Sequence, residues 1–181
     1  MASETLGEER AYWVSLPTSY NSTTAPQDYP VLYLLDGDSH FHYASGIVQF
    51  MSGDDVFHIP ELILVAIPNT NRTRDLTPTH SLVGYDGEEA ENQEASGGGT
   101  SFLRFIRDEL FPQIESAYRT LPHRILVGHS FGGLLALSAL LDAPEMFQSY
   151  IAIDPSLWWD DQMLVHRMER EFRAAQERRG S

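Results

Sequence analysis

Apolar residues along the chain fall into short continuous runs that alternate with stretches of helical spacing. The continuous runs are typical of strands buried on both faces of a parallel sheet, and they cover residues 31–35, 62–67, 125–127 and 150–153. Residues 12–16 follow an alternating pattern that ends at Pro17, which predicts a short edge strand. Strands that alternate with helices predict an α/β fold, with a mostly parallel sheet and helices on both faces.

Apolar positions at helical spacing predict helices between and after these strands. The expected helices cover residues 39–51, 102–118, 134–143 and 162–179, and the first of them begins at residue 39 or 40. Ser101 is expected to cap the second helix and Pro112 to kink it. The last helix is amphipathic and interleaves arginine with glutamate on a solvated face. Residues 70–100 predict a long irregular loop, whose acidic tract 86–94 is interpreted as solvated surface.

The segment Gly128-His129-Ser130-Phe131-Gly132 matches the pattern G-x-S-x-G and lies between a predicted buried strand and a predicted apolar helix. A sharp strand-to-helix turn strains the serine backbone. The residues two positions before and after the serine must be small, because a Cβ at Gly128 or Gly132 would collide with nearby backbone. The turn exposes the hydroxyl at the carboxyl edge of the sheet, above the free N–H groups of the following helix. The pattern predicts Ser130 as a nucleophile; the alternative is a glycine-rich helix cap with a structural serine.

The anion formed by attack on an ester carbonyl needs two N–H donors. One is expected from Phe131, the residue after the nucleophile. The other is expected from the loop after residues 31–35, where Gly37 lets the backbone turn inward. We assign it to the backbone N–H of Asp38, with Gly37 as the near alternative and as a residue bordering the substrate. The Asp38 carboxylate is expected to point away from the anion, toward the N-terminus of the next helix.

Length and composition limit the number of domains and the kinds of active site that the chain can form. The 181 residues predict one domain, with a core over residues 7–161 followed by the amphipathic helix, and the apolar fraction of 42% suffices for a core. All 12 basic residues are arginine and cysteine is absent, so disulfides, thiolate metal sites, P-loop lysines and Ser–Lys dyads are excluded. Asp36, Asp38, His40 and His42 fit no zinc-hydrolase signature, so no metal or other cofactor is expected.

Charge and hydropathy bear on partners and location. The net charge of −14 and the pI of about 4.7 argue against nucleic acid as a partner. No apolar stretch approaches the roughly 18 residues of a transmembrane helix, so no membrane span is expected. The first ten residues are polar and do not form a signal peptide. The expectation is a soluble protein, either cytoplasmic or secreted or periplasmic with its signal removed.

Several segments together resemble the putative-esterase group of α/β-hydrolases, which includes enterochelin and other siderophore esterases, feruloyl-esterase-like enzymes and, more distantly, mycolyltransferases. The matching segments are YWV before Pro17, YPVLYLLDG over 29–37, NRTRDLTP over 71–78, residues 124–133, and 151–159 with its double tryptophan. The resemblance extends over residues 7–161. It implies hydrolysis of carboxylic esters through an acyl-serine intermediate without a metal. It also implies Ser130 as nucleophile and the N–H groups of Asp38 and Phe131 as the oxyanion hole.

A serine nucleophile also needs a base, and the resemblance implies an acid and a histidine that follow two further strands. Only 51 residues follow Ser130, and His166 is the one histidine among them. We therefore expect an α/β-hydrolase that is incomplete at its C-terminus, with a sheet edge exposed for pairing with a second copy. Two alternatives stay open. Asp154 and His166 could serve as acid and base, or a partner chain could supply the missing strands and histidine.

The expected substrate is a small-molecule ester. Two other functions remain open: a module without a functional base, and an acyltransferase that uses the same serine with a sugar or an alcohol as acceptor. Trp158 and Trp159 follow the last predicted strand. They either pack in the core or form an apolar wall that binds an acyl or aryl group, which makes Trp158 a candidate substrate contact.

Overall fold

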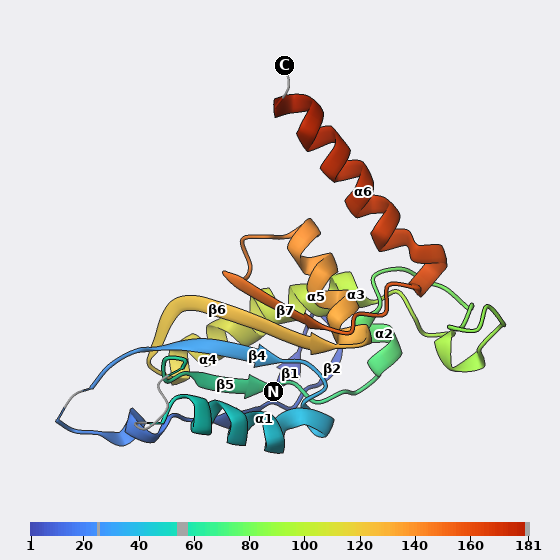
Figure 1. The fold of residues 1–181 in the computed structure, drawn as a ribbon. Coiled ribbons are helices and arrows are strands. Elements are labelled where there is room, and N and C mark those ends of the chain that lie inside the picture. Colours follow the sequence, from blue (N-terminus) through green and yellow to red (C-terminus); the bar gives the residue numbers. More distant parts are fainter. Residues whose placement is uncertain (25, 54–57, 180–181) are drawn as a thin grey trace.

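A computed structural model describes residues 1–24, 26–53 and 58–179 of the chain. Its centre is a five-stranded sheet in the order β3-β5-β4-β6-β7, of which the last four are labelled in Figure 1. The strands are β3 (Trp13–Ser15), β4 (Tyr29–Leu34), β5 (Ile63–Ala66), β6 (Thr120–His129) and β7 (Ser149–Ile153). The last four are parallel, and β3 pairs antiparallel with β5 at one edge. The predicted mostly parallel α/β sheet is therefore confirmed.

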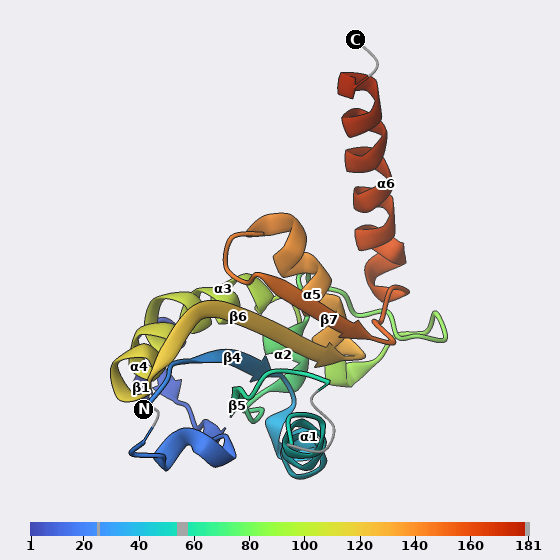
Figure 2. The ribbon, with the colours of Figure 1, turned by 60° about the vertical axis from the view of Figure 1, so that its left-hand side comes forward.

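Helices lie on both faces of the sheet, as predicted (Figure 2). One face is covered by α1 (Gly37–Met51), and the other by α3 (Gly99–Phe105), α4 (Phe111–Ala117) and α5 (Phe131–Asp142). Alternation along β4 separates the two layers, because Tyr33 packs with the α3–α5 layer and Leu34 with the α1 layer. In both views α6 (Trp159–Arg179) extends away from the body of the molecule. None of the helices within the described ranges has the length and apolar character that a membrane crossing requires.

Several boundaries differ from the sequence predictions. Ser101 does not cap its helix, because α3 already begins at Gly99 with Gly98 in the cap position. The disturbance expected from Pro112 takes the form of a π-helical turn, η3 (Ile106–Leu110), directly before α4. Strand β6 begins five residues earlier than predicted, since its first half is exposed and lacks the apolar run of a buried strand.

The predicted irregular segment 70–100 contains a helical turn, α2 (Arg72–Leu76), and a 3₁₀ turn, η2 (Glu91–Gln93). A further 3₁₀ turn, η1 (Thr18–Asn21), follows β3. A two-stranded sheet of β1 (Ala2–Ser3) and β2 (Glu8–Glu9) was not predicted, because strands of two residues leave no periodic signal. The α2 turn and this small sheet both support the candidate site.

Strand β7 forms the second edge of the sheet, and one of its faces is uncovered. Tyr150 and Ala152 pack against the main core, whereas Ile151 and Ile153 are 46% and 50% exposed. These isoleucines border an apolar hollow that also reaches Tyr43 of α1. An edge strand with exposed apolar side chains is a template for pairing with another chain.

We expect the 181-residue chain to dimerise through its β7 edges. Light scattering coupled to size-exclusion chromatography should give a mass that rises toward that of a dimer with concentration. The double variant Ile151→Lys/Ile153→Lys should remain monomeric, because charges on an edge strand oppose pairing. Leu121→Lys, which places the same charge on an exposed leucine at the start of β6, is the control and should still dimerise. A wild-type chain that stays monomeric at every concentration would refute this prediction.

Candidate active site

Ser130 lies at the turn between β6 and α5, in a backbone conformation that residues with a side chain seldom adopt. Its φ is 57° and its ψ is −115°. The Ser130 N–H donates to the Ile153 carbonyl oxygen at 3.0 Å. The Ser130 carbonyl oxygen accepts from the N–H groups of Leu134 at 2.9 Å and Ser156 at 3.1 Å. These bonds anchor the strained residue to α5 and to the chain after β7, and Ser130 itself is half-buried.

The glycines around Ser130 explain why this turn can close. A Cβ on Gly128 would lie 2.2 Å from the carbonyl oxygen of Gly132, which no side chain tolerates. A Cβ on Gly132 would instead meet side chains, at 3.3 Å from Leu35 Cβ and 3.4 Å from Asp36 Oδ2. The predicted collision with backbone therefore holds for Gly128 but not for Gly132. Gly132 brings its carbonyl against Gly128 and leaves space for the chain after β4.

Two backbone N–H groups near this turn are available to a ligand. Within the described ranges, neither the Phe131 N–H nor the Asp38 N–H has a backbone acceptor. Both lie in the first turn of a helix, α5 and α1 respectively, where N–H groups lack intrahelical partners. The Gly37 N–H is occupied, because it donates to the Ile67 carbonyl oxygen at 2.9 Å. Of the two donors weighed in the loop after β4, only that of Asp38 is free.

Asp36 positions the loop that carries the Asp38 N–H. Its φ of 54° is again left-handed, and the residue is only 3% exposed. The Asp36 carboxylate accepts two hydrogen bonds from Arg72, from Nε at 2.7 Å and Nη2 at 3.0 Å. A third comes from Asn69 Nδ2 at 2.7 Å. This bidentate ion pair holds a buried carboxylate beside the candidate nucleophile.

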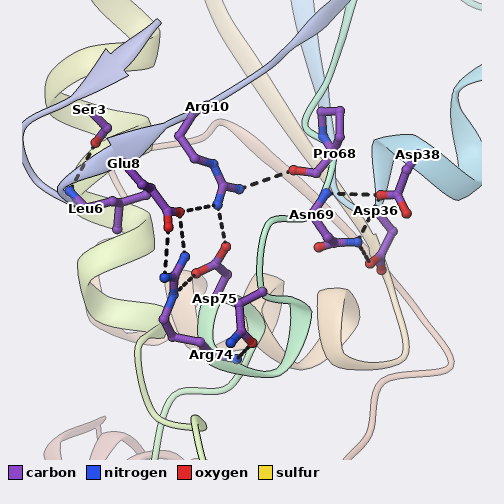
Figure 3. A network of polar contacts seen from close by, with 11 residues as sticks. Ser3, Leu6, Glu8, Arg10, Asp36, Asp38, Pro68, Asn69, Arg74 and Asp75 are labelled. Atoms are coloured by element: carbon purple, nitrogen blue, oxygen red, sulfur yellow. Dashed lines mark hydrogen bonds and ion pairs between the residues drawn. The ribbon is translucent and has the colours of Figure 1, made fainter.

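We expected the Asp38 carboxylate to point toward the N-terminus of the next helix, and this prediction is wrong. It accepts from the backbone N–H of Asn69 at 3.1 Å and from the Asn69 side-chain amide at 3.0 Å (Figure 3). Asn69 therefore bonds Asp36 and Asp38 together and fixes the segment from which the Asp38 N–H projects.

Arg72 also connects this loop to the serine turn. Its guanidinium carbon lies 5.2 Å from the centroid of the Phe131 ring, and Nη2 lies 3.5 Å from the carbonyl oxygen of His129. The same side chain thus contacts the segments that carry both candidate donors. Sequence reasoning did not assign a role to Arg72, Asn69 or Asp36, although Arg72 stands in the NRTRDLTP segment.

A second ion-pair network supports α2 from behind. The Arg10 guanidinium is almost fully buried and donates to Asp75 at 2.7 Å, to Glu8 at 2.9 Å and to the carbonyl oxygen of Pro68 at 3.2 Å (Figure 3). Arg74 also donates to Glu8 and Asp75, and its hydrogen bond is the main cause of the lowered pKa of Glu8. Since Pro68 directly precedes Asn69, the network links the β1–β2 sheet to the loop that holds Asp36 and Asp38.

The two tryptophans after β7 have different environments. Trp159 is fully buried with Leu134 and Leu164, and its indole N–H donates to Thr79. Trp158 is half-buried, with its ring 5.8 Å from that of Phe131 and 6.1 Å from that of Tyr85. Trp159 therefore belongs to the core, while Trp158 lies in an aromatic surface beside Ser130.

The candidate base and acid are not hydrogen-bonded to the Ser130 hydroxyl. The hydrogen bond that the structure gives to Ser130 Oγ joins it to Ser156 Oγ at 3.1 Å. No histidine or carboxylate of the described residues bonds to this hydroxyl. Asp154 follows β7 with a φ of 42° and is exposed, and His166 is exposed on α6. Within the described ranges, no cluster of three or more histidine, aspartate or glutamate side chains could hold a metal.

Gly128→Ala should destabilise the fold by about 3 kcal/mol, because the added methyl group overlaps the Gly132 carbonyl. Gly46→Ala is the matched control. Gly46 lies inside α1 with no atom within 4 Å of an added Cβ, so alanine should raise stability by about 0.5–1 kcal/mol. Urea unfolding followed by circular dichroism measures both variants. A small effect at Gly128 would contradict the steric argument.

Arg72→Leu should lower the free energy of unfolding by about 2–3 kcal/mol, since it leaves the buried Asp36 carboxylate with Asn69 alone. Arg72→Lys should recover only part of this loss, because an ammonium group cannot make the forked contact. In the control Arg107→Leu, which breaks an exposed pair with Asp108, unfolding should change by no more than about 0.5 kcal/mol. Equal losses in the two leucine variants would show that the Asp36 pair contributes no more than a surface pair.

Comparison with known proteins shows that the chain is similar to esterases. The chain is 32% identical over 172 residues to the ferri-bacillibactin esterase BesA of Bacillus subtilis, covering 90% of this chain and 59% of that protein. It is 31% identical over 173 residues to the siderophore triacetylfusarinine C esterase of Aspergillus fumigatus, covering 88% and 56%. The chain thus spans less than two thirds of the length of these relatives.

Solved structures show the same fold. The chain superposes on an IroE-like serine hydrolase from Shewanella oneidensis with a TM-score of 0.88 and 43% identity, covering 94% of this chain and 54% of the other. The sequence profile of the family described as Putative esterase matches residues 3–179. A match over nearly the whole sequence, on a sheet of this topology, shows that the chain belongs to the Putative esterase family of α/β-hydrolases.

Proposed function

We propose that this chain carries the nucleophile and the oxyanion hole of a serine esterase that hydrolyses carboxylic esters. The observation that supports this most directly is the strained turn at Ser130, which holds a half-buried hydroxyl at the start of α5. A serine that caps a helix for structural reasons gains nothing from a positive φ, whereas a nucleophile gains exposure at the edge of the sheet.

In the proposed reaction, Ser130 Oγ attacks the ester carbonyl carbon and its proton passes to a base. The negative charge that develops on the carbonyl oxygen is stabilised by the N–H groups of Phe131 and Asp38. Collapse of the tetrahedral intermediate releases the alcohol, which takes its proton from the protonated base, and leaves an acyl-serine. Water then attacks the acyl-serine and releases the acid.

The mechanism needs a base, and none of the described residues is hydrogen-bonded to the Ser130 hydroxyl in that role. His166 and Asp154 are both exposed and neither bonds to Ser130. We propose that a histidine from outside the described segments, in the same polypeptide or in a partner chain, approaches Ser130 from its open side.

The surface beside Ser130 favours esters with an aromatic group. Phe131, Trp158 and Tyr85 present ring faces and edges next to one another. The relatives named above are esterases of siderophores. We therefore propose siderophore-type esters as the substrate class of this chain too.

A second candidate function is a module that is catalytically silent on its own. The observation in its favour is that Ser130 Oγ is bonded to Ser156 and to no histidine of the described residues. This function predicts negligible hydrolysis of p-nitrophenyl acetate by the 181-residue chain. Acyl transfer would use the same serine and would be recognised by ester products when an alcohol is added.

Ser130→Ala should abolish both the hydrolysis of p-nitrophenyl acetate and the covalent labelling by a fluorophosphonate, because both need the Ser130 oxygen. The unfolding transition should stay within about 0.5 kcal/mol of wild type, since the backbone bonds of the turn do not involve the side chain. Intact-mass spectrometry and peptide mapping identify the labelled residue. Unchanged turnover in the variant, or a label on another residue, would overturn the proposed mechanism.

A further inference from the structure

The hydroxyl of Ser156 lies against the candidate nucleophile and has no evident structural task. Ser156 Oγ is 3.1 Å from Ser130 Oγ, and the residue is only 5% exposed. It follows β7 by three positions and precedes α6 by three. An N-cap residue directly precedes the first helical residue, so Ser156 stands too far before α6 to cap it with its side chain. Here the bond to the helix comes from the backbone, because the Ser156 carbonyl oxygen accepts from the Trp159 N–H at 3.1 Å.

The position of Ser156 does not depend on its own hydroxyl. Its N–H donates to the Ser130 carbonyl oxygen at 3.1 Å, and the Ser130 N–H donates to Ile153, three residues earlier. Pro155 packs against α5 so closely that a Cβ on Gly133 would lie 3.0 Å from its Cα. Backbone contacts therefore hold Ser156 beside Ser130, and removal of the side-chain oxygen should leave the turn in place.

A hydroxyl group has one hydrogen to donate and two lone pairs that accept. If Ser130 donated to Ser156, its hydrogen would point into the buried side of the turn, away from any base. If Ser156 donates, the hydrogen of Ser130 is free to point toward the exposed side of the turn, where a base can accept it. Donation by Ser156 also stabilises the negative charge that grows on Ser130 Oγ as its proton leaves.

We propose that Ser156 is a catalytic residue that donates its hydroxyl hydrogen to Ser130 Oγ, orienting the nucleophile and stabilising it as it loses its proton. This rests on the proposed esterase function, since Ser130 must be the attacking group. Ser156 keeps its own proton throughout the reaction, and no covalent bond to it forms or breaks. Only the strength of its hydrogen bond to Ser130 Oγ changes.

Ser156→Ala tests this role, with Ser138→Ala as the matched control. Ser138 is another buried serine, in α5, and its hydroxyl bonds to Asp142 instead of Ser130. The rate of fluorophosphonate labelling and the kcat and KM for p-nitrophenyl acetate are measured for the 181-residue chain between pH 5 and 10. Loss of one hydrogen bond to a developing charge should slow labelling and kcat at least about tenfold, with KM unchanged.

The pH profile separates catalysis from packing. Without the donor, Ser130 should lose its proton less readily, so the rise in labelling rate should move to higher pH in Ser156→Ala and not in Ser138→Ala. Ser156→Cys, which keeps a weak donor of similar size, should give an intermediate rate. A crystal structure of Ser156→Ala should show Ser130 Oγ in more than one rotamer.

The outcomes are distinguishable. If wild type reacts, Ser130→Ala does not, and Ser156→Ala matches wild type in rate and pH profile, the role of Ser156 is overturned and the esterase function stands. If Ser156→Ala is slow but keeps its pH profile and melts well below Ser138→Ala, Ser156 acts only through packing and the inference is also overturned. If wild type reacts no faster than Ser130→Ala even when imidazole is added to supply the base, the esterase function of this chain fails and the role of Ser156 fails with it.

Discussion

The structure depends on an abrupt change of chain direction at one edge of the sheet. Three neighbouring parallel strands, β4, β6 and β7, are each followed within two residues by a non-glycine residue with positive φ. These residues are Asp36, Ser130 and Asp154, with φ values of 54°, 57° and 42°. Each such residue costs of order 1–3 kcal/mol, and such residues persist only where the surroundings hold them. Three of them on adjacent strands gather loops and helix starts at a single edge.

The surroundings hold these turns in two ways. Backbone hydrogen bonds fix Ser130 between Ile153, Leu134 and Ser156. Ion pairs fix Asp36, through the forked contact with Arg72. Because the chain contains no lysine, every side-chain cation that pairs with a carboxylate here is a guanidinium or an imidazole, and a guanidinium fork sets direction as well as charge. Arg10 and Arg74 use the same property to bind Glu8 and Asp75, which links the N-terminal strands to α2.

Local signals allowed the sheet and the serine turn to be predicted from the sequence. Buried parallel strands are continuously apolar, and the turn at Ser130 needs small residues on either side, so both leave a pattern over a few adjacent positions. The ion pairs of Arg72 with Asp36 and of Arg10 with Asp75 join residues 36 and 65 positions apart, and no periodicity in the sequence predicts them. For the same reason, the predicted direction of the Asp38 carboxylate was wrong, and the sequence did not indicate that Ser156 meets Ser130. The short β1 and β2 strands depend on tertiary packing in the same way.

The glycine at position 128 has a consequence for how substitution data on this protein should be interpreted. Its missing side chain is required by a carbonyl oxygen that any β-carbon would overlap, so every replacement disturbs folding first. A mutational scan that scores only activity would rank this position with the chemical groups, although it touches no reacting atom. Only a parallel measurement of protein abundance can separate residues that shape the backbone from residues that perform the reaction.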